Sequence, residues 1–426
     1  MRRHRVPAAM LHTVSVSMLL ALISIPVGAQ SESGPSKPRA RDLGIPFEGT
    51  PGRHNAITDV AGVEIGHTTL ISGEGPLTQG KGPVRTGVTA ILPRGRAGGA
   101  PVFGGWFSLN GNGEMTGTTW VEESGVLEGP VLVTNTHSVG VARDVTIQWM
   151  LRHRPDFLWA LPVVAETFDG VLNDINGFHV TSAHVLAALD GARGGPVVEG
   201  AVGGGTGMLC NGFKGGIGTS SRLLPAASGG YTLGVLVQCN YGSQRGLRIA
   251  GVPVGQELVE PGVCVAGSKP PSRKWLRHMP RCAMRNSNRE RPNSEHGSII
   301  IVIATDAPLL PHQLRRLVKR ATLGLGREGS ISSNFSGDIF IAFSTANPGL
   351  AADTNQVDVR MIPNERLDPL FEATVQATEE AVTNAMIAAA TMTGADSIRA
   401  HGLPHDQLVA ILRKYNRLAR PREVRR

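Results

Sequence analysis

The chain has 426 residues, of which 41% are hydrophobic, so it is long enough to bury one large core or two medium ones. Its net charge of +8 is peripheral, because the first five residues carry three arginines and residues 269–296 and 413–426 carry a net +6 each, which leaves −7 for the rest. With 4% aromatic residues to stack on bases, this distribution argues against a nucleic-acid-binding protein.

The first 29 residues have the pattern of an export signal. A basic head with three arginines precedes the mostly apolar residues 14–25, and Val27-Gly28-Ala29 supplies small residues for a cleavage site. A membrane anchor is the competing interpretation, but the apolar run is shorter than the ~20 residues that a spanning helix needs. We expect residues 1–29 to be a signal peptide, and the mature protein to lack a membrane span and to be periplasmic or secreted.

Strand and helix patterns are mixed through the remaining chain, with no internal repeat. Short β-type runs between Gly-rich turns predict strands at 59–67, 87–92, 130–134, 197–202, 231–238, 299–304 and 339–343. Helical periodicity or composition predicts helices at 140–152, 312–320 and 367–391. Such a mixture favours layered sheets with helices on their outer faces.

The four cysteines contain no CxxC pair, which argues against zinc and redox motifs. Cys210 and Cys239 lie in apolar surroundings and are expected to be small core residues. Cys264 and Cys282 flank the basic segment, and whether they form a disulfide stays open.

Several catalytic templates are absent: GxSxG, HExxH and GxxxxGK[ST] do not occur. Residues 324–329 match GxGxxG, but they follow an Arg-rich helix rather than a strand, so a turn is expected and a dinucleotide site is not. We expect no metal and no organic cofactor.

The junction of Gly297 and Ser298 carries the strongest chemical signal. A hydroxyl nucleophile stands directly before the apolar run 299–304, and a segment rich in Arg, Pro, Asn and Ser that looks exposed precedes it. A serine hydroxyl needs a base, and an α-amine freed by a cut before Ser298, with a pKa of about 7.7–8.0, is such a base. Gly297 lacks Cβ and tolerates the backbone strain of such a cut. The alternative is a loop that merely ends before a buried strand.

Three further residues could support this hydroxyl. Ser336 and Asp338 would project to the same side if a strand begins by Ser336, so the carboxylate could orient a hydroxyl. The amide of Asn240, at the end of a predicted strand, could donate to an oxyanion. Ordinary turn chemistry is the alternative for all three.

Five motifs in chain order carry a specific resemblance. They are DVAGVEIGH at 59–67, AETFDG at 165–170 with LND at 172–174, NYG at 240–242, GSIIIVIATDAP at 297–308 and NFSGDIFIAFSTAN at 334–347. Together, over about Gly44 to His401, they resemble the DmpA family of self-processing aminopeptidases, which includes L-aminopeptidase/D-amidase/D-esterase enzymes and β-aminopeptidases.

The resemblance implies an α+β fold, a four-layer αββα sandwich similar to that of amino-terminal nucleophile hydrolases. It implies a cut between Gly297 and Ser298, which leaves an α chain of residues 30–297, with a basic linker at 268–296, and a β chain of residues 298–426. Ser298 would be the nucleophile and its own α-amine the base.

The resemblance also implies the other roles. Ser336 and Asp338 match the supporting serine and acidic residue, Asn240 matches the oxyanion donor, and Glu166 matches the carboxylate that binds the substrate's amino terminus. Phe168 stands where L-aminopeptidase/D-amidase members carry a tyrosine, so the preference among L-α, D-α and β-amino residues stays open.

The expected substrates are small peptides, amides or esters with a free amino terminus, and the processed αβ units are expected to form a homo-oligomer. An ornithine-acetyltransferase-like acyltransferase is the main alternative, but those enzymes use threonine and are cytoplasmic. An exported binding protein without catalysis is the other alternative.

Overall fold

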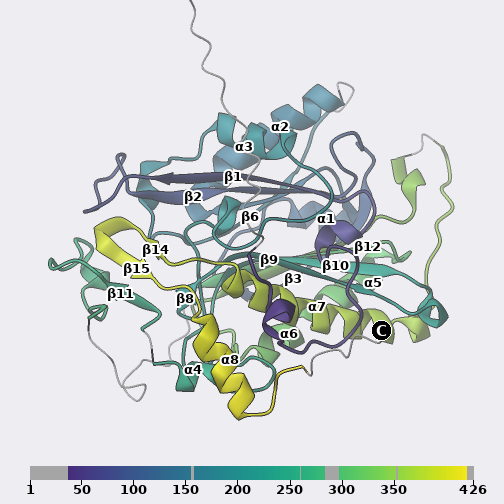
Figure 1. The fold of residues 1–426 in the computed structure, drawn as a ribbon. Coiled ribbons are helices and arrows are strands. Elements are labelled where there is room, and N and C mark those ends of the chain that lie inside the picture. The colour runs from purple at the N-terminus through teal and green to yellow at the C-terminus, as the bar shows by residue number, and fades with distance from the viewer. Residues whose placement is uncertain (1–36, 155–157, 260, 284–296, 352–353, 420–426) are drawn as a thin grey trace, which may run out of the picture. The chain divides into compact units, whose positions relative to one another are not determined.

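The computed structural model describes residues 37–154, 158–259, 261–283, 297–351 and 354–419 (Figure 1). The expected signal peptide lies outside these residues, and so do residues 284–296 of the linker. Within the described ranges, no helix is both long and apolar enough to cross a membrane.

A four-stranded sheet forms the first β-layer, with strand order β1-β2-β5-β6. β1, β2 and β5 pair antiparallel, whereas β5 and β6 are parallel. The strand bounds are Glu64–Ser72 (β1), Val84–Leu92 (β2), Val131–Asn135 (β5) and Val163–Thr167 (β6).

A six-stranded sheet forms the second β-layer, with strand order β4-β3-β13-β12-β10-β9. The central strand β12 pairs parallel with β13 and antiparallel with β10, so the run that begins at Ser298 has a strand on both sides. The bounds are Val126–Leu127 (β4), Val102–Gly111 (β3), Gly337–Ser344 (β13), Ser298–Thr305 (β12), Thr232–Asn240 (β10) and Gly216–Leu223 (β9).

Helices cover the outer faces of both sheets (Figure 1). α2 and α3 pack on the four-stranded sheet, and α5, α6 and α7 pack on the six-stranded sheet. A third apolar cluster, with Val133 from one sheet and Ile300 from the other, fills the space between the sheets. The predicted α+β four-layer αββα sandwich is therefore confirmed. The bounds are Val139–His153 (α2), Ser182–Asp190 (α3), Pro311–Val318 (α5), Ala321–Arg327 (α6) and Asp368–Ile387 (α7).

Smaller elements surround the sandwich. A three-stranded sheet has the order β11-β15-β14, and β7 and β8 form a short hairpin. These strands are Val263–Val265 (β11), Ile398–Ala400 (β15), Met392–Thr393 (β14), Leu209–Cys210 (β7) and Phe213–Lys214 (β8). The remaining α-helices are Thr118–Ser124 (α1), Val254–Glu257 (α4) and His405–Lys414 (α8).

Three local predictions are corrected by the structure. Residues 197–202 form no strand and make only an isolated bridge from Gly200 to Ile217, because a short apolar run in a loop has the same sequence pattern as a strand. The first predicted strand begins at Glu64 rather than Asp59, after a short 3-10 helix. The GxGxxG segment lies mostly within α6 instead of forming a turn, and its last glycine follows the helix with φ +92°.

Both cysteine pairs form disulfides. Cys264 and Cys282 are joined, with Cα atoms 5.0 Å apart. Cys210 and Cys239 are buried as expected, but they also pair, with Cα atoms 5.5 Å apart. The expectation that they are simple core residues is wrong because β7 contacts the end of β10, a proximity that sequence spacing does not reveal.

Candidate active site

The Gly297–Ser298 bond lies at the start of the central strand β12. Ser298 is the first residue of the strand, is 6% exposed, and aligns with Asn240, the last residue of β10. Gly297 has a φ of +109°, and a Cβ at this position would lie 1.9 Å from the Asn240 carbonyl oxygen. The junction therefore requires glycine on both conformational and steric grounds.

Two contacts from the start of β13 converge on this bond. The Ser336 hydroxyl donates a hydrogen bond of 2.7 Å to the Gly297 carbonyl oxygen, which belongs to the bond between Gly297 and Ser298. The Gly337 N–H donates to the Ser298 Oγ at 3.1 Å. Because Ser336 is fully buried, its hydroxyl polarises the carbonyl in a site of low dielectric.

Asp338 is also fully buried, and it directly follows Gly337, whose N–H contacts Ser298. β13 begins at Gly337, after Ser336, and Asp338 aligns with Ile299 rather than with Ser298. The predicted pairing of the Ser336 and Asp338 side chains was conditional on a strand that begins by Ser336; the strand begins at Gly337, and the pairing stays a prediction.

Both ends of the Asn240 amide are fixed. Its Oδ1 accepts a hydrogen bond of 2.8 Å from the Leu209 N–H, and its Nδ2 donates to the Phe168 carbonyl oxygen at 3.1 Å. These partners assign the amide orientation, since only Nδ2 can donate. An amide nitrogen has two hydrogens, so one remains for another acceptor at the cavity that Asn240 lines.

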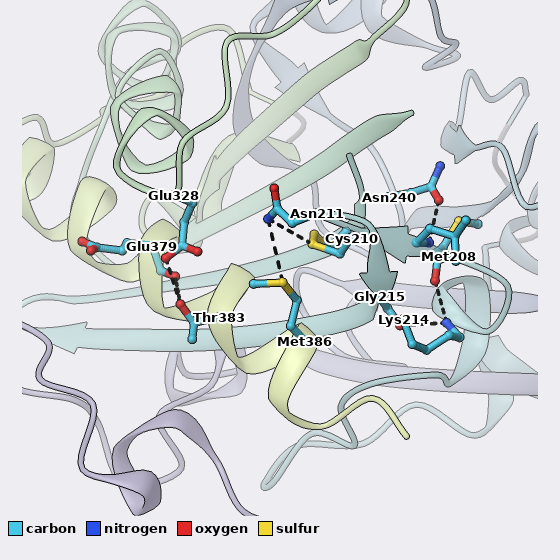
Figure 2. The surroundings of a disulfide bond; sticks show 12 residues. Met208, Cys210, Asn211, Lys214, Gly215, Asn240, Glu328, Glu379, Thr383 and Met386 are labelled. Atoms are coloured by element: carbon cyan, nitrogen blue, oxygen red, sulfur yellow. Dashed lines mark hydrogen bonds between the residues drawn. A yellow bond between two sulfur atoms is a disulfide. The ribbon is translucent and has the colours of Figure 1, made fainter. Parts of the chain in front are cut away.

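A buried lysine supports the peptide group that holds Asn240 (Figure 2). The Lys214 Nζ donates to the Met208 carbonyl oxygen at 2.7 Å and to the Gly215 carbonyl oxygen at 2.8 Å. The Met208 carbonyl and the Leu209 N–H belong to one peptide unit, so this unit links the ammonium to the Asn240 amide. Burial lowers the pKa of Lys214 to about 7, against an opposing effect of the Asp169 carboxylate.

Glu166 places a carboxylate at the same cavity. It is a residue of β6, is 4% exposed, and accepts hydrogen bonds from the Glu114 N–H at 3.0 Å and from the Thr136 hydroxyl. Burial raises the pKa of Glu166, while the hydrogen bond from Thr136 acts in the opposite direction. A carboxylate has about four acceptor positions, so these two donors leave room for a substrate ammonium.

The cavity has a volume of about 910 Å³ and brings most of the predicted residues together. Ser298, Gly297, Asn240, Glu166 and Phe168 all line it, whereas Ser336 and Asp338 are not among the described lining residues. Its lining includes the polar residues Ser298 and Glu166. It also includes apolar side chains that sequence reasoning assigned to a linker: Trp275, Leu276, Met279 and Pro280.

The sequence profile of peptidase family S58 matches residues 55–400, which is most of the chain. The chain belongs to peptidase family S58. The resemblance of its motifs to the DmpA family is therefore confirmed, and the protein is a hydrolase, an aminopeptidase of family S58.

Relatives within family S58 agree with this assignment. The β-peptidyl aminopeptidase BapA of Sphingosinicella microcystinivorans is 54% identical over 407 residues, which cover 95% of this chain and 97% of the relative. The solved L-aminopeptidase D-Ala-esterase/amidase of Ochrobactrum anthropi, described as a variant of the Ntn hydrolase fold, matches with a TM-score of 0.78 and 48% identity, covering 90% of this chain and all of that chain. A β-aminopeptidase of Burkholderia sp. matches with a TM-score of 0.76 and 46% identity, over 88% and 98% of the two chains.

Sequence reasoning missed three neighbours of the family S58 site. Thr136 and Glu114 hold the carboxylate of Glu166, and Lys214 holds the peptide beside Asn240. One feature of the sequence could have pointed to Lys214: it is a single lysine within an otherwise apolar and Gly-rich stretch.

One cluster has the composition of a metal site. Cys264, Cys282 and His401 place their ligand atoms within 4.8 Å of one another. The disulfide removes both thiolates, which are the forms of cysteine that bind metal, so the cluster does not suit a metal ion.

Proposed function

We propose that this aminopeptidase cuts its own Gly297–Ser298 bond and then uses the freed Ser298 as the nucleophile for its substrates. The observation that carries the proposal is the hydrogen bond of 2.7 Å from the Ser336 hydroxyl to the Gly297 carbonyl oxygen. A donor on that oxygen polarises the carbonyl carbon, and the Ser298 hydroxyl belongs to the adjacent residue.

In the processing step, the Ser298 Oγ attacks the Gly297 carbonyl carbon while Ser336 stabilises the oxyanion. The C–N bond then breaks, the nitrogen takes up the proton that the Ser298 hydroxyl gives up and becomes an α-amine, and Gly297 is left as an ester on Oγ. Water hydrolyses this ester and releases a carboxylate at Gly297 and a free hydroxyl at Ser298. The products are the proposed α chain, residues 30–297, and β chain, residues 298–426.

In the aminopeptidase reaction, the new α-amine accepts the proton of the Ser298 hydroxyl as Oγ attacks the substrate carbonyl. The free hydrogen of the Asn240 amide is the donor to the oxyanion. The proton passes to the leaving amine, and water then hydrolyses the acyl-enzyme. Glu166 binds the substrate ammonium, which restricts cleavage to the amino-terminal residue.

The proposed substrates are peptides, amides or esters whose amino-terminal residue is a β-amino acid. The 54% identity to a β-peptidyl aminopeptidase and the similarity to a Burkholderia β-aminopeptidase support this choice. L-α and D-α residues are the alternatives, since the Ochrobactrum enzyme is named for both. We further propose that residues 1–29 direct export to the periplasm or medium, and that processed αβ units form a homo-oligomer.

The first test is denaturing electrophoresis with amino-terminal sequencing of the wild type and of Ser298→Ala. The wild type is expected to give two fragments, one of which begins Ser-Ile-Ile-Ile, and the variant is expected to stay whole. The processed protein is then given the p-nitroanilides of β-alanine, L-alanine and D-alanine, with the fastest release expected from β-alanine. If fully processed protein hydrolysed none of the three p-nitroanilides, the proposal would be refuted.

Glu166→Gln tests the binding of the substrate amino group. The amide keeps the shape but loses the charge, so KM is expected to rise about tenfold or more while processing is unaffected. Glu365→Gln is the matched control, because Glu365 is exposed and is not among the described residues that line the cavity. Loss of processing in Glu166→Gln would assign Glu166 a structural role instead.

A further inference from the structure

Residues 264–282, here called the strap, form a wall of the cavity that contains Ser298. Within the strap, residues 275, 276 and 278–280 line this cavity together with Glu166 and Ser298. The strap precedes the proposed cut, so after processing it would belong to the end part of the α chain. Its position over the site needs an explanation, because a chain end normally frays unless contacts hold it.

The two ends of the strap are joined covalently and by backbone hydrogen bonds. The disulfide between Cys264 and Cys282 closes the loop. Beside it, the Val265 N–H donates to the Pro280 carbonyl oxygen at 2.8 Å, and the Cys282 N–H donates to the Val265 carbonyl oxygen at 3.1 Å. Since Cys264 belongs to β11, which pairs with β15, these bonds tie the strap to the body of the protein.

The middle of the strap is held by Arg273. Its Nε donates to the Asp396 carboxylate at 3.1 Å, and the neighbouring Ser272 hydroxyl donates to the same carboxylate at 2.9 Å. The Arg273 guanidinium also donates to the carbonyl oxygens of Gly170 and, at 2.9 Å, Val171. The strap is therefore attached to the loop that directly follows Phe168.

The apolar side chains of the strap have two different surroundings. Leu276 is 4% exposed and packs with Leu172 and Ile398, so it anchors the strap. Trp275, in contrast, is 57% exposed at the cavity, and its ring centroid lies 6.2 Å from that of Phe168. A large apolar side chain in this position would cover both rings and would remove their surface from water.

We propose that the strap forms the side-chain subsite of the enzyme, and that this subsite takes a large apolar or aromatic side chain of the substrate's amino-terminal residue. The inference rests on the proposed function, because it uses Ser298 and Glu166 to orient the substrate. With the ammonium at Glu166 and the carbonyl at Ser298, the remaining substituent of that residue is directed to the rest of the cavity, where Phe168 and Trp275 lie. The disulfide keeps this wall in place after the cut.

Trp275→Ala tests the subsite, with Trp159→Ala as the matched control. Trp159 is also exposed, at 51%, but it packs on Trp120 and is not among the described lining residues of the cavity. For each processed variant, kcat/KM is measured for the p-nitroanilides of β-alanine and of β-homophenylalanine. We expect Trp275→Ala to lower kcat/KM about tenfold or more for the bulky substrate and by less than about threefold for β-alanine. Trp159→Ala is expected to change neither.

If Trp275→Ala lowered kcat/KM equally for both substrates, or did not lower it for the bulky substrate, the proposed subsite would be overturned. If processed wild-type protein cut neither substrate, the proposed function itself would fall and the subsite with it. That result is distinguishable because it appears before any substitution is made.

A second variant, Cys264→Ser with Cys282→Ser, tests the disulfide. After processing, the unbridged strap is expected to lose the preference for the bulky substrate and to be cut faster by trypsin after Lys274 or Arg277, as read by mass spectrometry. Unchanged preference together with unchanged proteolysis would show that the disulfide does not hold the wall.

Discussion

At the scale of single residues, Gly297, which precedes the proposed cut, leaves no room for a side chain. Its φ of +109° and the 1.9 Å approach of a Cβ to the Asn240 carbonyl oxygen exclude a side chain. Alanine there must displace the end of β10 or the junction itself, and a shift of about 1 Å costs a reaction about a hundredfold. Gly297→Ala is therefore expected to process about a hundredfold more slowly, followed as the fraction of uncut chain over time.

Gly251→Ala is the matched control for this experiment. Gly251 also has a positive φ, of +77°, but nothing lies within 4 Å of its Cβ position. It carries the conformational strain without the collision, so it should process at the wild-type rate. Equal processing of Gly297→Ala and Gly251→Ala would contradict the steric account of the junction.

Lys214 provides a second prediction at this scale, because it acts on Asn240 through the Met208–Leu209 peptide. Asn240→Ala removes the proposed oxyanion donor, so kcat should fall about 10²–10³-fold. Lys214→Met removes the ammonium and keeps the length of the side chain, and it is expected to lower kcat about tenfold with little change in KM.

The double variant separates a positioning role from general destabilisation. If Lys214 works through Asn240, the double variant should be no slower than Asn240→Ala alone. Losses in kcat that multiply would show that Lys214 acts by another route.

The sequence identified most residues at this site but not their partners. Ser298, Gly297, Asn240, Glu166 and Phe168 were found by motif and line one cavity. Thr136 and Lys214 were missed because their contacts join segments that are distant along the chain or run through a backbone carbonyl, and neither leaves a pattern in sequence. For Asp338, the motif was found, and its supporting role beside Ser336 stays a prediction.

At the scale of elements, apolar runs in the sequence predicted strands and helices correctly where both faces of the element are buried. β12, β13 and α7 are nearly fully buried, and all three were predicted from their composition. The strand predicted at residues 197–202 was wrong, because a short apolar run also occurs in a partly exposed loop, where Val198 is 51% exposed. The helix at 324–327 was missed because glycine is a poor helix former, and tertiary packing of α6 on α7 overrides that preference here.

The contact between α6 and α7 contains an ionisable group that makes stability depend on pH. Glu328, at the end of α6, is 1% exposed and accepts a hydrogen bond of 2.9 Å from the Thr383 hydroxyl (Figure 2). Burial, and to a smaller degree the charge of Glu379, raises the pKa of Glu328 well above its ordinary value. Between the unfolded and the folded pKa, the folded protein binds the extra proton, so stability falls as the pH rises through that interval.

Glu328→Gln should remove this loss of stability at higher pH. The Tm of the variant is expected to exceed that of the wild type by about 2–4 °C at about pH 8, and the difference should shrink toward about pH 4.5, where the unfolded glutamate is also protonated. Glu365→Gln, at an exposed glutamate, should show no such trend. A Tm difference that stays constant over this range would contradict a raised pKa.

At the scale of the whole molecule, the proposed cut divides the chain without dividing the fold. β12 and β13 of the proposed β chain lie together between β10 and β3 of the proposed α chain, so the six-stranded sheet would contain strands of both products. The family resemblance predicted the sandwich, but composition and periodicity alone predicted only layered sheets and helices. Strand order could not follow from them, because it depends on pairings between distant segments.

This arrangement predicts that the two fragments stay together after processing. β12 keeps its antiparallel register with β10 from Asn240–Ser298 to Leu233–Thr305, so the chains cannot part without breaking the sheet. On a native size-exclusion column the fragments should co-elute, and they should separate only in denaturant. Separation under native conditions would rule out a shared sheet in the processed enzyme.

The central claim is that the freed Ser298 is the nucleophile. Its most direct test is to mix processed protein with an ester of a β-amino acid, to quench the reaction rapidly with acid, and to measure the intact masses of the fragments. We predict that the acyl group is found on the fragment that begins at Ser298 and is attached to Ser298 itself. The added mass should be absent when the ester is omitted. An acyl group on another residue, or turnover by a wild-type chain that is still uncut at Gly297, would contradict this claim.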